Sequence, residues 1–157
     1  MSAVEDRLKE LGLTLPDVAK PVAAYVPAVR DGNTIFTSGQ LPMVSGALVQ
    51  TGKVGAGDGL VSADDAKKLA QTCALNAIAA VKSVIGDLDK VTRVVKVVGF
   101  VASEPSFTGQ PGVINGASEL LGKAFGAAGV HARSAVGVAA LPLDAPVEVE
   151  ITVSVQD

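Results

Sequence analysis

A valine-rich segment near the middle of the chain, VTRVVKVVGFVA at residues 91–102, most strongly limits the folds open to this sequence. Its β-branched residues occupy both odd and even positions, which is typical of a central strand buried on both faces. The segment at 147–155 alternates instead, with valine and isoleucine on one side and residues such as Glu148 and Glu150 on the other. We therefore expect a sheet with one apolar core face, whose second face meets solvent or a partner subunit.

Two longer segments with helical periodicity are available to cover the apolar face. The first, residues 62–86, begins at Ser62, which can cap a helix, and stops at Gly86. A second helix is predicted near 112–125, and a short one over residues 2–12. The apolar stripe expected to lie on the sheet comprises Leu69, Cys73, Ala77, Ala80 and Val84.

The remaining elements are strands. AYVPAVRDGNTIFTSGQLP predicts two strands joined at the Asp31-Gly32-Asn33 turn, and Pro27 indicates that the first is an edge strand or carries a bulge. A short strand is considered at Ala47–Gln50, and another is expected near 133–140. The order α-ββ(β)-α-β-α-ββ contains no repeat or linker. It predicts one α+β domain over residues 1–157, with helices on one face of a single sheet.

Composition narrows the function classes. A net charge of −3 and 3% aromatic residues argue mildly against RNA binding, which uses basic surfaces and aromatic platforms. No apolar run approaches the roughly 18 residues of a membrane span, and the opening MSAVEDRLKELGLTLP lacks the apolar core of a secretory signal. The single cysteine, Cys73, cannot form an internal disulfide, which fits a reducing cytoplasm. We expect a cytoplasmic protein.

Few side chains are candidates for chemistry. Cys73 is interpreted as a core residue, and His131, the only histidine, as a loop residue without the neighbours that a metal site needs. Arg133 is the strongest candidate, because the small residues around it leave its guanidinium uncovered and free to bind one carboxylate through two parallel hydrogen bonds. A structural ion pair with an acid such as Glu148 is the alternative, and the residues alone favour it.

Two separated stretches resemble one known family. ARSAVGVAALPLDAPVEVEI is similar to the C-terminal signature of the Rid/YjgF family of enamine/imine deaminases, and AAYVPAVRDGNTIFTSGQLP is similar to its N-terminal motif. The agreement runs over roughly residues 20–157, which leaves residues 1–20 as a helical extension. The resemblance implies the chorismate-mutase-like α+β fold: a single mixed sheet with two main helices on one face. It also implies a further strand between the last two strands, and a homotrimer with three clefts between subunits.

The resemblance further implies an activity that needs no cofactor and no metal. Family members hydrolyse reactive 2-enamine and 2-imine acids, such as 2-aminoacrylate, to 2-oxo acids and ammonia. Arg133 would hold the substrate carboxylate, and Glu148 would orient or activate water. The other positions carried over are substrate-binding: Tyr25, Ser38, Gly39, Asn115 and the backbone of Ala135.

Some positions depart from the family pattern and indicate a divergent branch. Ser118 stands where many members have tyrosine, and Ala135 stands where many have cysteine. A non-catalytic binder of small carboxylates using the same cleft is the main alternative, and a ribonuclease is a weaker one. Counting along the strands puts Arg133 about seven residues from the level of Glu148, roughly 20 Å. We therefore expect no direct pair within one chain, whereas a site shared between chains is allowed.

Overall fold

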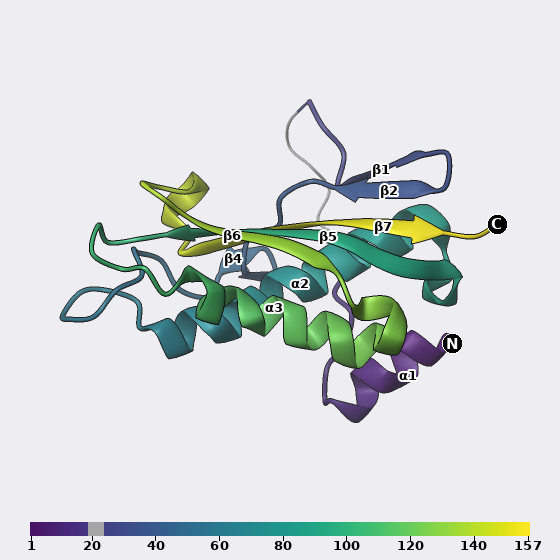
Figure 1. Ribbon diagram of the computed structural model, residues 1–157, viewed down its shortest axis with the longest axis horizontal. Coiled ribbons are helices and arrows are strands. Elements are labelled where there is room, and N and C mark those ends of the chain that lie inside the picture. Colours follow the sequence, from purple (N-terminus) through teal and green to yellow (C-terminus); the bar gives the residue numbers. More distant parts are fainter. Residues whose placement is uncertain (19–23) are drawn as a thin grey trace.

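The computed structural model describes residues 1–18 and 24–157, with the helices on one side of the main sheet (Figure 1). In these residues the α-helices are α1 (Ala3–Glu10), α2 (Ala63–Ile85) and α3 (Gln110–Phe125). The strands are β1 (Ala28–Asp31), β2 (Thr34–Thr37), β3 (Met43–Val44), β4 (Ala47–Leu48), β5 (Val91–Ala102), β6 (Ala132–Val138) and β7 (Val147–Val155). Short 3-10 turns are η1 (Leu88–Lys90), η2 (Gly126–Gly129) and η3 (Pro142–Asp144).

The main sheet has the strand order β1-β2-β7-β5-β6. The β5–β6 pair is parallel, and the other neighbouring pairs are antiparallel. The predicted α+β class, with one main mixed sheet and α2 and α3 on one face, is confirmed, and β3 and β4 form a separate two-stranded antiparallel sheet. β5 lies between the last two strands, as the resemblance implied, and β1 is an edge strand, as Pro27 indicated.

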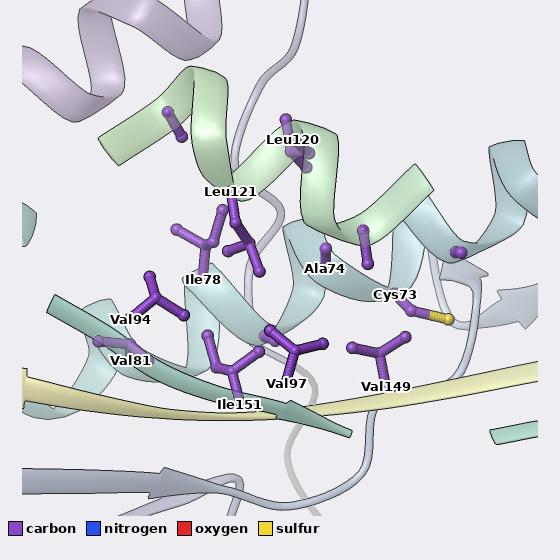
Figure 2. Close-up of a cluster of buried hydrophobic side chains, with 14 of the residues drawn as sticks. Cys73, Ala74, Ile78, Val81, Val94, Val97, Leu120, Leu121, Val149 and Ile151 are labelled. Atoms are coloured by element: carbon purple, nitrogen blue, oxygen red, sulfur yellow. The ribbon is translucent and has the colours of Figure 1, made fainter. Parts of the chain in front are cut away.

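The core lies between this sheet and the two long helices (Figure 2). Val97 of β5 and Ile151 of β7 pack with Ile78 of α2 and Leu121 of α3, and all four are at most 2% exposed. Each such side chain contributes about 1.5–3 kcal/mol through burial. Cys73 is buried among them as predicted, and this burial raises the pKa of its thiol, so the sulfur stays protonated.

α2 is covered on more than one side, because it packs against α3 as well as the sheet. The predicted stripe is therefore only the centre of a wider buried surface that also includes Ile78 and Val81. The prediction for Val84 is wrong: it is 37% exposed, and the neighbouring Ile85 is buried. Gly116 of α3 makes the helix contact close, since a Cβ there would lie 1.9 Å from the carbonyl oxygen of Lys67.

The face of the sheet away from α2 and α3 is only partly covered. The predicted alternation of β7 is confirmed, with Val147 to Val155 buried at every second position. The two-sided burial predicted for β5 is half right: Val97 and Val101 are buried, but Val95 is 40% exposed. Val95 lies at an irregularity in the pairing of β5 with β7, between Val94 and Lys96, and no described helix of this chain covers the second face of the sheet. We call it the open face.

The N-terminal helix α1 packs against α3 and η1. Ser2 and Glu5 form a reciprocal capping box at its start, and Asp89 of η1 accepts hydrogen bonds from the backbone N–H groups of Ala3 and Val4. Residues 19–20, the end of the predicted extension, lie outside the described residues. No helix among the described residues is long and apolar enough to cross a membrane.

Candidate functional site

Arg133 projects from the edge strand β6 toward α3. Its register partner on β5 is Val97, which faces the helices, so the Arg133 side chain shares that face of the sheet. Its Nη1 donates to Asn115 Oδ1 at 2.7 Å and to Ser118 Oγ at 3.3 Å, both on α3. Ala135, two residues farther along β6, lies on the same side. The structure therefore brings Arg133, Asn115 and Ala135 together, and we call them the arginine half-site.

Arg133 is not part of an ion pair in the described part of the chain. The ion pairs there join Arg30 to Asp157, Lys67 to Glu119, and Lys82 to Glu5. The structural ion pair between Arg133 and Glu148, which the residues alone favoured, is therefore wrong. The reason lies in the strand faces: every second residue of β7 packs into the core, and Glu148 lies on the opposite, open face.

The strand register also corrects the expected spacing. Arg133 is level with Val97, and Val97 pairs with Ile151 of β7. Glu148 is three positions from Ile151, so the offset along the strands is about 10 Å and not roughly 20 Å. β6 ends at Val138 and β7 begins at Val147, so the connection is centred near Pro142. When two strands run antiparallel, the numbers of two residues at the same level add up to twice the centre of the connection. Moving that centre by one or two residues therefore shifts which residues are level by twice that number. The expectation of no direct pair stands because the side chains lie on opposite faces.

Glu148 lies against Gly39, the glycine that follows β2. A Cβ at Gly39 would be 1.9 Å from Glu148 Oε1, so the carboxyl group occupies the space that a side chain there would take. Desolvation by burial raises the pKa of Glu148, and repulsion from the nearby Glu150 carboxylate adds to the effect. A carboxyl group that keeps its proton closer to neutral pH is suited to general acid–base chemistry.

Ser38 and Tyr25 lie near Gly39. The Ser38 hydroxyl donates to the carbonyl oxygen of Val26 at 2.6 Å, and its backbone N–H donates to that of Pro27 at 2.8 Å. Ser38 therefore fixes the segment that carries Tyr25, whose side chain is 59% exposed. Tyr25 and Gly39 also line a cavity of about 330 Å³, which is mainly apolar. We call Tyr25, Ser38, Gly39 and Glu148 the glutamate half-site.

The predicted residues thus form two groups in one chain. Arg133 lies on the helix-covered face of the sheet, whereas Glu148 lies on the open face, with β5 between their strands. A small substrate cannot contact both side chains through the sheet. Among the described residues there is also no cluster of three or more His, Cys, Asp or Glu side chains that could hold a metal ion.

A family model described as "YjgF/chorismate mutase-like, putative endoribonuclease" matches residues 5–153. The chain belongs to this family. Membership in the YjgF family supports a small-molecule-binding or endoribonuclease-like role.

Relatives from distant organisms extend the YjgF match over nearly the whole chain. Protein TCP17 of Trypanosoma cruzi is 43% identical over 155 residues, covering 98% of this chain and 95% of that protein. The crystal structure of Atu1372 from Agrobacterium tumefaciens, of unknown function, superposes with a TM-score of 0.90 at 46% identity, covering 98% and 93% of the two chains. A "putative endoribonuclease" from Shewanella oneidensis gives a TM-score of 0.91 at 32% identity, covering 97% and 99%.

Reasoning from the sequence did not connect Ser118 and His131 of this YjgF protein to the arginine half-site. His131 is a loop residue before β6, as predicted, but its ring is held on both sides, since Nδ1 lies 2.6 Å from the Gly129 carbonyl oxygen and Nε2 lies 2.8 Å from Ser118 Oγ. Asn115 and Ser118 are three residues apart on a helix, and His131 and Arg133 are two apart along an extended chain. These spacings put each pair on one side of its element, and that is the signal that could have joined them.

Proposed function

We propose that this YjgF family member is a cofactor-independent hydrolase that deaminates 2-imino acids to 2-oxo acids and ammonia. The observation that carries the proposal is that Nε and Nη2 of Arg133 have no hydrogen-bond acceptor among the described residues. Arg133 is half-buried, and its guanidinium is held by Asn115 and Ser118 and has no carboxylate partner among the described residues. A fixed guanidinium is well matched to a carboxylate on a small substrate.

The reaction requires addition of water at the imine carbon. With the substrate carboxylate on Arg133, the neighbouring C2 is held in a defined place. A water molecule attacks C2, a C–O bond forms, and the C–N bond then breaks to release ammonia. The Glu148 carboxyl, whose pKa is raised by burial, can donate a proton to the imine nitrogen and accept one from the attacking water. Neither step requires an oxidant or a metal.

The two half-sites must then come from different subunits. Arg133 and Glu148 lie on opposite faces of one sheet, so a complete site needs a second copy of the chain. The open face supplies a surface for such contact, because Val29, Phe36 and Val136 are each 44–50% exposed. A homotrimer with three equivalent clefts, as the family resemblance implies, satisfies this requirement through a head-to-tail interface.

The first test measures 2-oxo acid release from 2-aminoacrylate generated enzymatically in the assay. Arg133→Ala should reduce the protein-dependent rate on the order of 100-fold, because charge-assisted hydrogen bonds to the substrate are lost. Arg133→Lys should also be impaired, since an ammonium group cannot form the planar fork. Arg30→Ala is the matched control, as Arg30 pairs with Asp157 at the chain end. If Arg133→Ala deaminates as fast as the parent, the proposed site is wrong.

The same preparation separates catalysis from simple binding. A protein that binds pyruvate through Arg133 but does not accelerate deamination of several amino-acid-derived imines would be a carboxylate binder, the alternative function.

A second test addresses the shared site. Arg133→Ala and Glu148→Gln chains, each inactive alone, are unfolded, mixed in equal amounts and refolded together. If each cleft takes Arg133 from one subunit and Glu148 from its neighbour, about a quarter of the clefts receive both native residues. Activity should therefore recover to roughly this fraction of the parent. A mixture that remains as inactive as the separate variants would show that both residues act from one chain.

A further inference from the structure

We infer that Ser118 and His131 are positioning residues for Arg133, which hold its guanidinium so that the Nε–Nη2 edge faces the ligand carboxylate. The inference rests on the proposed function, because it assumes that Arg133 binds a carboxylate. It adds a side-on binding geometry and two residues that had no role in the family resemblance.

The donor count of the guanidinium defines the geometry. Nη1 carries two hydrogens, and both have acceptors: Asn115 Oδ1 at 2.7 Å and Ser118 Oγ at 3.3 Å. Among the described residues, Nη2 and Nε of Arg133 have no hydrogen-bond partner. The end-on fork of Nη1 with Nη2 is therefore closed to a ligand. The side-on fork of Nε–H and Nη2–H is open and matches the two oxygens of a carboxylate.

The direction of each hydrogen bond follows from the chemistry of its groups. The Gly129 carbonyl oxygen can only accept, so Nδ1 of His131, 2.6 Å away, carries the hydrogen. In the neutral ring Nε2 is then an acceptor, and the Ser118 hydroxyl, 2.8 Å away, donates to it. The lone pairs of Ser118 Oγ remain available to Arg133. Each hydrogen bond therefore donates in the same direction, from Arg133 to Ser118, from Ser118 to His131 and from His131 to the Gly129 carbonyl.

The backbone anchors this chain of hydrogen bonds at its far end. Gly129 is the last residue of η2, the turn that follows α3, and it is buried. A Cβ at Gly129 would lie 2.4 Å from the carbonyl oxygen of Leu121, so only glycine lets the turn pack this closely on the helix. The same helix carries Asn115 and Ser118. The acceptors that hold Nη1 and the carbonyl that orients His131 therefore belong to one rigid unit.

The test compares variants that remove the relevant atoms with variants that keep them. Ser118→Ala removes the hydroxyl, whereas Ser118→Thr retains it. His131→Phe keeps a ring without nitrogen, whereas His131→Gln keeps an acceptor near the position of Nε2. Ser83→Ala in α2 is the control, because Ser83 donates only to the Ala80 carbonyl of its own helix. Circular dichroism and thermal unfolding check that each full-length variant is folded.

Two measurements follow for each variant. Pyruvate is titrated by calorimetry, and the Arg133 Nε–H signal is followed by ¹⁵N NMR with and without pyruvate, assigned by its absence in Arg133→Ala. We expect roughly 5- to 10-fold weaker binding in Ser118→Ala and His131→Phe, as for the loss of one ordinary intramolecular hydrogen bond. Ser118→Thr and His131→Gln should stay within about twofold of the parent. The Nε–H signal should shift on pyruvate binding in the parent. In ligand-free Ser118→Ala the signal should be that of a disordered Arg133 side chain, because its Ser118 hydrogen bond is lost.

The outcomes separate this inference from the proposed function. If Arg133→Ala loses pyruvate binding but Ser118→Ala and His131→Phe bind like the parent, the positioning role is overturned and the carboxylate site stands. If the parent itself binds no pyruvate, the proposed function fails. The ligand-free NMR signal then still decides the positioning role: an Arg133 Nε–H equally ordered in the parent and Ser118→Ala overturns it, and an ordered signal lost only in Ser118→Ala and His131→Phe supports it.

Discussion

Gly39→Ala tests whether the Glu148 carboxyl must lie where the structure places it. The new Cβ would be 1.9 Å from Oε1 and 2.8 Å from Cδ of Glu148. Gly39 is not among the glycines with positive φ, so alanine is compatible with its backbone. The clash is with the end of a flexible side chain, and Glu148 should rotate away at about 0.5–1.5 kcal/mol. Lower chain entropy in the unfolded state offsets about 0.4–1 kcal/mol of this. Stability should therefore change little, while deamination falls on the order of 100-fold as proton transfer is lost.

The assay is a double-mutant cycle of deamination rate and urea unfolding over the parent, Gly39→Ala, Glu148→Gln and the double variant. Because Gly39 acts through Glu148, the double variant should be no slower than Glu148→Gln alone. Gly112→Ala in α3 is the control, since no atom lies within 4 Å of its Cβ position. Parental activity in Gly39→Ala, or two losses that simply add, would refute the reasoning.

Two further predictions concern stability. The folded state favours the protonated Glu148 carboxyl, because its pKa is raised, so ionisation costs stability as pH rises through that pKa. Glu148→Gln should therefore unfold at higher urea than the parent at neutral pH, with the difference vanishing below the ordinary carboxyl pKa of 4.5; a pH-independent difference would contradict this. Gly116→Ala drives a Cβ to 1.9 Å from the Lys67 carbonyl and should cost roughly 1–3 kcal/mol or more. Gly122→Ala should not lower stability in this way, because the space at its Cβ position is open. Equal urea midpoints for Gly116→Ala and Gly122→Ala would rule out the close α2–α3 contact.

Local patterns were sufficient for most of the elements. The boundaries predicted for α1, α2, α3 and β6 agree with the structure to within two residues, and those of β5 and β7 agree fully. The short strand considered at Ala47–Gln50 corresponds to β4, Ala47–Leu48, whereas its two-residue partner β3, Met43–Val44, was not predicted. The position of β5 between β6 and β7 came from the family resemblance, since residue spacing alone also allowed a hairpin.

The candidate site was less accessible, because side-chain contacts depend on how elements meet. The parity of β7 correctly placed Glu148 on its polar side. The sequence could not show that Arg133 faces the helices, because that depends on the register of β6 against β5. Nor could it show the Ser118–His131 contact, which forms only because η2 returns the chain along α3 before β6 begins. Each of these errors at the site therefore arose where two elements had to be positioned relative to one another.

The opposite placement of the two half-sites explains why their separate properties are compatible with one reaction. If Arg133 and Glu148 lay side by side in one chain, their charges would pair, Glu148 would have a lowered pKa and Arg133 would have no pair of donors left for a substrate carboxylate. Separation by the sheet instead leaves Glu148 with a raised pKa and Arg133 without a carboxylate in the described residues. A cleft between subunits can then hold a small carboxylate between the two groups, so that the substrate and not Glu148 satisfies the guanidinium. If the proposed function holds, a contact between subunits would be part of the catalytic machinery, because it would bring an acid and a cation together only where a ligand can lie between them.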